Sequence, residues 1–284
     1  MMVSVASWKG SPGVTTVSAL LAAHWGGYGD RRIIMEVDPS GGTLAARWSS
    51  AHGLTWDPGL LDLSSIRRDL DHDVLDQVSQ AVGDGISVIS APPGTRQISR
   101  GIERMGDRIR RLGELEDVVV FADLGRLTAS SPVLGVARSS VLTLMVCRTS
   151  LEQIQGLVPI AAELKSVGCR LGLVAVDSGP YQPEEAADVA GIELIGVIPH
   201  APKSAAMFDS DGLMAGRAFW RSAMCRGARQ AADDVRDRVM ELVGGADVND
   251  WVPPRTDPDK GYADLDGGPQ FSAGNSTTST EVGP

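Results

Sequence analysis

A short segment near the amino terminus has residue types that suit phosphate binding. Residues 7–16 read SWKGSPGVTT. Phosphate-binding loops combine glycines with a lysine that is followed directly by serine or threonine. Here Gly13, Thr15 and Thr16 are in place, but Val14 occupies the position of the lysine. The segment therefore predicts a phosphate-binding loop that lacks one of its cations.

Much of this chemistry does not need the missing lysine. Gly10 and Gly13 would let a phosphate approach the main chain, and the free N–H groups at the start of the next helix favour an anion. Thr15 is placed to offer its hydroxyl to a magnesium ion, as the residue after the lysine does in such loops. Judged alone the signal is weak, because a Gly-Ser-Pro-Gly turn between a strand and a helix needs no ligand.

Two aspartates are expected to lie beside this loop. Asp38 follows residues 33–37, which are apolar except for Glu36, and Asp123 follows the apolar residues 118–122. The carboxyl ends of parallel strands form the sheet edge at which such folds bind ligands. Two carboxylates beside a phosphate loop are what Mg²⁺ and an attacking water require. Either aspartate alone could instead cap a helix.

The elements that would position these residues alternate along the chain. The predicted strands are residues 3–6, 33–37, 86–90, 118–122, 141–147, 171–176 and 194–198. The predicted helices are residues 15–24, 74–82, 98–112, 151–167, 184–189 and 217–243. This alternation predicts a doubly wound α/β fold, with a mostly parallel sheet of about seven or eight strands and helices on both faces.

Composition limits the domain organisation. The 284 residues, 43% of them hydrophobic, suit one main domain, which we expect to span residues 1–243. Residues 244–284 are rich in Asp, Gly, Pro, Ser and Thr, which predicts a disordered acidic tail. A net charge of −10 argues against strong nonspecific nucleic-acid binding. The arginine-rich residues 108–111 are better explained as a solvated helix face.

Cysteine spacing and apolar runs predict the compartment. Cys147, Cys169 and Cys225 have neither metal-ligand spacing nor an even count, which favours buried thiols in a reducing cytoplasm. No apolar run approaches the roughly 20 residues that span a bilayer, so we expect no transmembrane segment. Gly10 and Gly13 interrupt the amino-terminal apolar stretch, so a signal peptide is not expected either.

The loop and the acids together resemble the ParA/MinD group of P-loop ATPases, over about residues 2–243. The matching positions are Lys9 for the group's additional signature lysine, Gly10 and Gly13 for its glycines, Thr15 and Thr16 for its threonines, Glu36 and Asp38 for the acids that end its second strand, and Asp123 for its Walker B aspartate. The resemblance implies a P-loop fold with ATP and Mg²⁺ as ligands.

Three departures from the group's pattern are specific. Ser11 stands for a glycine, Val14 stands for the second lysine, and Asp177 lies where many members have an asparagine that contacts adenine. Within the group the chain looks most like the degenerate branch of CpaE and TadZ pilus-localisation proteins, in which the second lysine is often replaced. The departures imply that nucleotide binding is weakened and that hydrolysis is weakened further.

The resemblance also implies roles for individual residues. The nucleotide would be bound by Lys9, Gly10, Ser11, Pro12, Gly13, Val14, Thr15 and Thr16. Thr15, Asp38 and Asp123 would hold the metal, and Asp38 and Lys9 would act in hydrolysis. In the resembled group the signature lysine reaches across a nucleotide-sandwich dimer to the partner's phosphates, so a homodimer is expected.

Two functions are open at this stage. The first is a nucleotide-binding switch, with weak or absent ATP hydrolysis, that positions a pilus or secretion system, a septum or a chromosome through protein partners. Losing one charge-assisted phosphate contact costs about 1.5–3 kcal/mol, or roughly 10- to 100-fold in affinity, which cellular ATP levels tolerate. The second is a pseudo-ATPase scaffold that binds no nucleotide and acts through dimerisation. Either would be cytoplasmic, with recruitment to the membrane or cell pole through partners.

Overall fold

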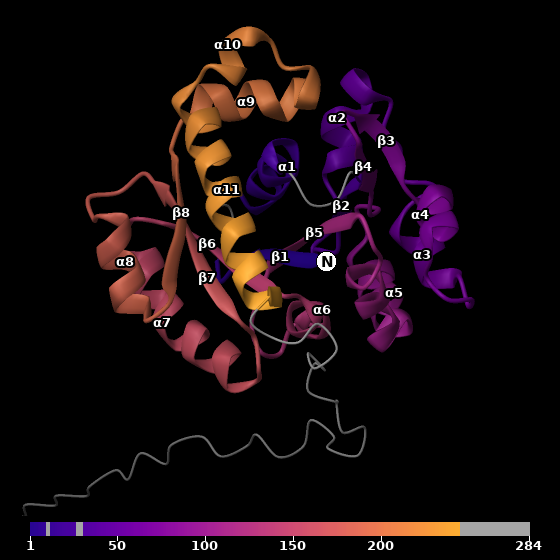
Figure 1. Ribbon diagram of the computed structural model, residues 1–284, viewed down its shortest axis with the longest axis horizontal. Helices are drawn as coiled ribbons and strands as arrows, with labels where there is room; N and C mark the ends of the chain where they lie inside the picture. Colours follow the sequence, from indigo (N-terminus) through magenta and orange to yellow (C-terminus); the bar gives the residue numbers. More distant parts are fainter. Residues whose placement is uncertain (10–11, 27–30, 245–284) are drawn as a thin grey trace, which may run out of the picture. The chain divides into compact units, whose positions relative to one another are not determined.

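A single sheet forms the centre of the protein. The computed structural model describes residues 1–9, 12–26 and 31–244. The strands are β1 (Met2–Ser7), β2 (Arg31–Glu36), β3 (Gln80–Gly83), β4 (Ile86–Ile89), β5 (Val118–Arg126), β6 (Leu142–Arg148), β7 (Leu171–Asp177) and β8 (Glu193–Pro199). They form an eight-stranded sheet in the order β3-β4-β2-β5-β1-β6-β7-β8 (Figure 1).

Strand pairing in the sheet is parallel except between β3 and β4. β1 lies in the middle, between β5 and β6. β5 is buried along its length up to Gly125, as expected for a parallel strand that is covered on both faces. The predicted doubly wound, mostly parallel α/β fold is confirmed.

Helices cover both faces of the sheet. They are α1 (Val14–His24), α2 (Leu44–His52), α3 (Leu60–Ser65), α4 (His72–Val78), α5 (Thr95–Met105), the 3-10 helix η1 (Gly106–Gly113), α6 (Leu134–Ser139), α7 (Leu151–Ser166), α8 (Pro183–Ala190), α9 (Pro202–Asp211), the 3-10 helix η2 (Gly212–Met214), α10 (Arg217–Trp220) and α11 (Ala223–Gly244). α1, α2, α9, α10 and α11 supply one apolar cluster, and α3 to α8 supply the other (Figure 1).

Three predicted helices differ from the observed elements. The helix expected at residues 74–82 ends at Val78, because Gly83, Asp84 and Gly85 adopt positive φ angles and turn the chain from β3 back into β4. The helix expected at residues 98–112 breaks at Gly106, whose φ is 47°. The carboxyl-terminal helix expected at residues 217–243 is split into α10 and α11.

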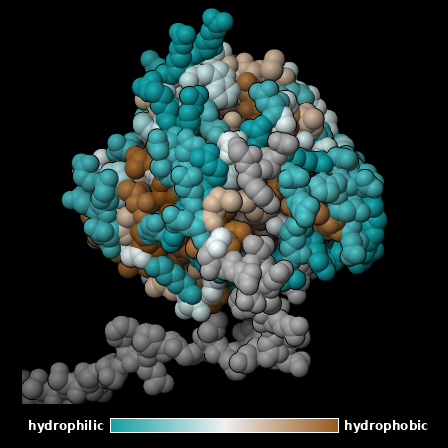
Figure 2. All heavy atoms as spheres, in the orientation of Figure 1, coloured by the Kyte–Doolittle hydropathy of each residue, from teal (hydrophilic) through white to brown (hydrophobic). Residues whose placement is uncertain are grey.

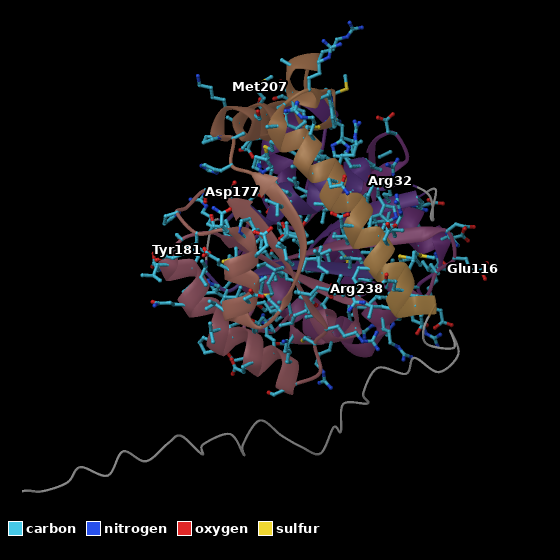
Figure 3. The ribbon with its side chains drawn as sticks, turned by 60° about the vertical axis from the view of Figure 1, so that its left-hand side comes forward. Arg32, Glu116, Asp177, Tyr181, Met207 and Arg238 are labelled. Atoms are coloured by element: carbon cyan, nitrogen blue, oxygen red, sulfur yellow. The ribbon has the colours of Figure 1, made fainter. Side chains whose placement is uncertain are left out.

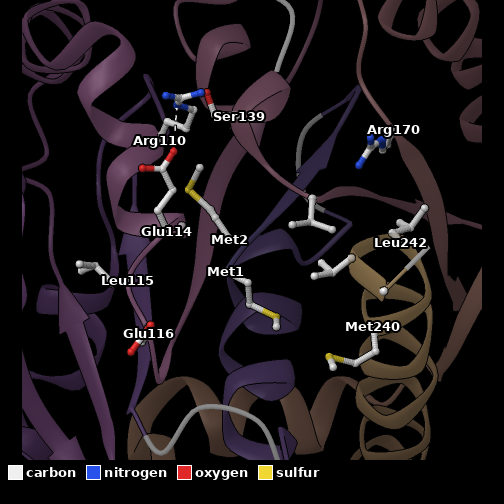
Figure 4. Close-up of a pocket in the computed structure, with 14 residues that line it drawn as sticks. Met1, Met2, Arg110, Glu114, Leu115, Glu116, Ser139, Arg170, Met240 and Leu242 are labelled. Carbon is white, nitrogen blue, oxygen red and sulfur yellow. Dashed lines mark ion pairs between the residues drawn. The ribbon is translucent and has the colours of Figure 1, made fainter. Parts of the chain in front are cut away.

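A cavity of about 730 Å³ lies at the amino edge of the sheet, where β1 begins (Figure 4). Met1, Met2, Met240 and Leu242 contribute apolar lining, and Glu114 pairs with Arg110 at its side. Parallel strands separate their amino and carboxyl ends, so this cavity and the loop after β1 lie at opposite edges of the sheet.

The surface and the cysteines complete the fold. In the view of Figure 2 the protein is mostly hydrophilic, with smaller hydrophobic areas. Over the described part of the chain, none of the helices has both the length and the apolar character needed to cross a membrane. The three cysteines are buried and unpaired. The tail predicted at residues 244–284 lies outside the described residues, except for Gly244, which ends α11.

Candidate functional site

The segment that joins β1 to α1 leads into a helix whose first residue lacks a side-chain cap. Gly10 and Ser11 lie outside the described residues, and Pro12 is buried. Gly13 is the N-cap residue of α1, with a φ of 105° that favours glycine, and no side chain caps the helix there. The first N–H groups of α1 therefore have no side-chain acceptor at the N-cap, which is the arrangement that suits an anion.

Two side chains fix the first half of this segment against α7. The Trp8 indole Nε1 donates a 2.8 Å hydrogen bond to the carbonyl of Gln153, and its ring fills the space that a Cβ would take at Gly156. The Lys9 ammonium pairs with the carboxylate of Glu152 and lies 5.7 Å from the centre of the Trp8 ring. Lys9 is therefore held by its own chain at the start of α7.

Asp123 is the buried carboxylate of the site. It is only 2% exposed and lies between Glu36 on β2 and Val5 on β1 in the strand register. The Thr15 hydroxyl and the Gly125 N–H, the latter at 3.0 Å, both donate hydrogen bonds to it. The register shifts after Val5, and Gly125 has a φ of 60°, so a bulge bends the end of β5 back toward its own aspartate.

Asp38 lies on the other side of this bulge. A Cβ at Gly125 would overlap the Asp38 carboxylate, so the two residues are in close contact and only glycine fits there. The Ser40 N–H donates a 2.7 Å hydrogen bond to Asp38. The structure thus brings together Thr15, Asp38 and Asp123, the three residues that the sequence nominated as metal ligands.

Glu36 has a structural role that differs from the role predicted for Asp38. It is 1% exposed, and its carboxylate accepts hydrogen bonds from the N–H groups of Thr43 (2.6 Å), Leu44 (2.8 Å) and Ala91 (3.1 Å). Glu36 therefore holds the start of α2 and the chain after β4 in place. This fixed use makes Glu36 part of the scaffold that positions Asp38.

Burial sets the electrostatics of the three acids. Desolvation raises the pKa of Asp123 to about 7, opposed by the Thr15 and Gly125 hydrogen bonds and reinforced by the charges of Glu36 and Asp38. Burial also raises the pKa of Asp38, with Ser40 and the charge of Arg126 acting against it. A bound cation would relieve the crowding of these negative charges.

The donor set fits Mg²⁺ only when other oxygens are supplied. No group of three or more His, Cys, Asp or Glu side chains within the described ranges is arranged to hold a metal ion alone. Mg²⁺ is usually bound by one or two carboxylates together with waters and substrate phosphates. Thr15, Asp38 and Asp123 match that requirement beside an uncapped helix end, so the residues fit a metal that arrives with a phosphate.

The remaining nominated residues are more scattered. Val14 is 7% exposed and packs in the apolar cluster on the α1 face. Thr16 accepts a 3.3 Å hydrogen bond from Arg47, a residue of α2. Asp177 ends β7 and is exposed, and Figure 3 shows it on the side of Tyr181 and away from Glu116.

Sequence reasoning missed three residues that shape the site. Gly125 carried a local signal, since a glycine two residues after an aspartate at a strand end allows a bulge. Glu152 and Arg47 carried none. Their positions depend on how α7 and α2 pack against the loop, and α2 was not predicted as a helix.

Asp123→Asn should stabilise the ligand-free protein at neutral and higher pH. The pKa of Asp123 is about 7 in the folded chain and about 3.9 in the unfolded chain. The unfolded chain therefore loses this proton first, and the folded state becomes less stable as the pH rises between these two values. At pH 8 we expect the variant to be more stable by about 2–4 kcal/mol, measured by urea unfolding without nucleotide or metal. The exposed control Asp69→Asn should follow the wild-type pH profile. Identical pH profiles for Asp123→Asn and the wild type would contradict the assignment.

The comparisons with known proteins agree with this geometry at the level of the fold. No family model matches the chain, and no curated protein sequence matches it. Solved structures do. A ParA family ATPase from Chlorobium tepidum has 18% identity and a TM-score of 0.68, over 81% of this chain and 96% of that one. The Pyrococcus furiosus cell division ATPase MinD has 19% identity and a TM-score of 0.66, over 84% and 98%. The septum site-determining protein MinD from Pyrococcus horikoshii, complexed with Mg-ADP, has 17% identity and a TM-score of 0.67, over 85% and 98%. At these identities the similarity shows the fold, which is that of the ParA/MinD ATPases.

Proposed function

We propose that this protein is a nucleotide-binding switch of the ParA/MinD type that binds ATP with Mg²⁺ and hydrolyses it slowly or not at all. One observation carries the proposal. The Thr15 hydroxyl is hydrogen-bonded to the buried Asp123, beside Asp38, at the uncapped start of α1. A purely structural turn has no need of a buried, desolvated aspartate at this place.

Binding would use mainly the backbone of the loop. Residues 9–16 would surround the phosphates, with Gly10, Ser11, Gly13, Val14, Thr15 and Thr16 offering N–H groups and Pro12 offering none. Thr15, Asp38 and Asp123 would hold Mg²⁺, which would supply positive charge next to the phosphates. Compared with a loop that has the second lysine, this site would keep all its metal ligands but would lack one ammonium group.

Hydrolysis would suffer more than binding from the loss at Val14. An ammonium at this position would stabilise the charge that develops as the terminal phosphoryl group is transferred. Asp38, which is half-buried and accepts hydrogen bonds from Ser40, would orient an attacking water. Because the water would be oriented but the ammonium would be missing, we expect slow hydrolysis and a long-lived ATP-bound form of the protein.

Lys9 would connect nucleotide binding to dimerisation. Its side chain is 45% exposed and that of Glu152 is 70% exposed, so their ion pair contributes at most about 1 kcal/mol. A phosphate of the nucleotide bound to the second subunit would displace Glu152 from Lys9 at a cost of at most about 1 kcal/mol. We propose a nucleotide-dependent homodimer that positions a pilus or secretion system, a septum or a chromosome, with the replaced lysine favouring the CpaE/TadZ-like branch.

The burial of Val14 favours the second candidate, a pseudo-ATPase scaffold. Its isopropyl group contributes to the apolar cluster on the α1 face, so the position has acquired a packing role. A scaffold of this kind would keep the fold and the dimer surface and would bind no nucleotide. Titration with ATP and Mg²⁺ separates the two candidates.

Val14→Lys should tighten ATP binding by about 10- to 100-fold, because it restores one charge-assisted phosphate contact. Isothermal titration of Mg-ATP into the wild type and the variant measures this change. Val14→Met is the matched control, since it provides a long side chain without charge and should leave the affinity unchanged. Absence of ATP binding by both the wild type and Val14→Lys, in folded protein, would establish the scaffold instead.

Lys9→Ala should lower ATP-dependent dimerisation while leaving the monomer folded, because Lys9 lies in a loop and supports no core. Glu152→Gln should raise dimerisation, since it frees the Lys9 ammonium. Sedimentation velocity with ATP and with ADP measures both effects. Lys165→Ala removes an exposed lysine from the other end of α7 and serves as the control. Dimerisation that is equal in all four proteins would remove Lys9 from the interface.

A further inference from the structure

We infer that Arg47 is a phosphate-binding residue of this site and supplies part of the positive charge that Val14 lacks. The ligand class is a nucleoside di- or triphosphate, and the inference rests on the proposed nucleotide binding. Arg47 lies on α2, an element that none of the sequence patterns predicted.

The position of Arg47 places its charge at the first turn of α1. Its Nη2 atom donates a 3.3 Å hydrogen bond to the Thr16 hydroxyl, one residue after the nominated metal ligand Thr15. The same atom pairs with the carboxylate of Asp209 on α9. The Arg47 side chain is 22% exposed, so most of it is enclosed between α1, α2 and α9.

The surroundings of Arg47 are strongly acidic. Its charge interacts favourably with Glu36 and with Asp123, the buried carboxylate of the site. Burial lowers the pKa of Arg47 and these two acids raise it, and an arginine stays protonated in proteins. A permanent cation thus lies within electrostatic reach of both the helix end and Asp123, one of the nominated metal ligands.

The hydrogen bonding of Arg47 is incomplete. A guanidinium has five N–H donors, and both polar contacts described above use Nη2. The Nε–H is buried and has no acceptor among the residues that the structure describes. A buried donor without an acceptor is energetically unfavourable. Phosphate oxygens are well suited to remove that cost, because guanidinium and phosphate groups pair in a planar, often bidentate geometry.

Arg47 is not the only residue that docks α2 among those that the structure describes. The neighbouring Trp48 is 1% exposed, donates a 3.1 Å hydrogen bond from Nε1 to the Phe208 carbonyl and packs edge-on against the Phe208 ring. These contacts already fix α2 to α9. Arg47 therefore adds to the packing of α2 against α1 and α9 without being its sole contact, and its enclosed charge beside Thr16 has a direct use in binding an anion.

The test is the affinity for Mg-ATP and Mg-ADP, measured by isothermal titration. Arg47→Met keeps the apolar stem and removes the charge, and should weaken binding by about 10- to 100-fold. Arg31→Met is the matched control. Arg31 is 23% exposed and pairs with Asp76 at 2.7 Å, but it begins β2 and so lies at the opposite edge of the sheet. The Arg31→Met variant should bind Mg-ATP and Mg-ADP with the affinity of the wild type.

Two further variants keep the test decisive if Arg47→Met folds poorly. Arg47→Lys keeps the charge without the planar fork and should lose less affinity than Arg47→Met. Asp209→Asn frees Arg47 and should tighten binding. If the wild type binds ATP and Arg47→Met matches Arg31→Met, or Arg47→Lys and Asp209→Asn both match the wild type, this inference is wrong and the proposed function stands. If neither the wild type nor Val14→Lys binds, both fail.

Discussion

The buried carboxylate of Asp123 is the constraint on which the rest of the site depends. A carboxylate that is 2% exposed, next to the equally buried Glu36, is costly to ionise. The protein tolerates it because β5 is otherwise apolar and lies next to the central strand, where the sheet is most strongly supported. Among the described residues, Thr15 and Gly125 donate the hydrogen bonds that stabilise its charged form. In the proposed function, a bound metal ion adds to the charge of Arg47 in offsetting this cost.

The two acids of the second strand show how one short segment serves scaffold and chemistry together. Glu36 uses both carboxylate oxygens on backbone N–H groups and so fixes the start of α2. Asp38, two residues later, has left the strand and lies against Gly125. Gly42 is required for the same closure, because a Cβ there would overlap the Ala91 carbonyl and crowd the Glu36 carboxylate. The position of Asp38 therefore depends on a buried network that binds no ligand itself.

The sequence predicted the sheet well because parallel strands are buried on both faces and read as short apolar runs, as residues 118–122 do. It also placed Thr15, Asp38 and Asp123 at one sheet edge, since both aspartates directly follow predicted strands and Thr15 begins the predicted helix after the first strand. Strand β3 and helices α2, α3, α6 and α9 were not predicted. β3 overlaps the end of the helix that was predicted at residues 74–82. The contacts of Arg47 depend on how α2 packs, and no local pattern contains that information.

The positive charges near the loop lie at different positions from those in the resembled loops. The position that carries an ammonium in the resembled loops holds a packed valine, while two other cations lie at its sides, each paired with an acid of the same chain: Lys9 with Glu152, and Arg47 with Asp209. The Lys9–Glu152 pair is weak because both side chains are exposed, at 45% and 70%. In the second pair Asp209 is 48% exposed, whereas Arg47 is only 22% exposed. Without a ligand the acids neutralise the loop and limit self-repulsion. In the proposed function, both cations would turn toward a bound phosphate, and together they would supply much of the positive charge that Val14 does not provide.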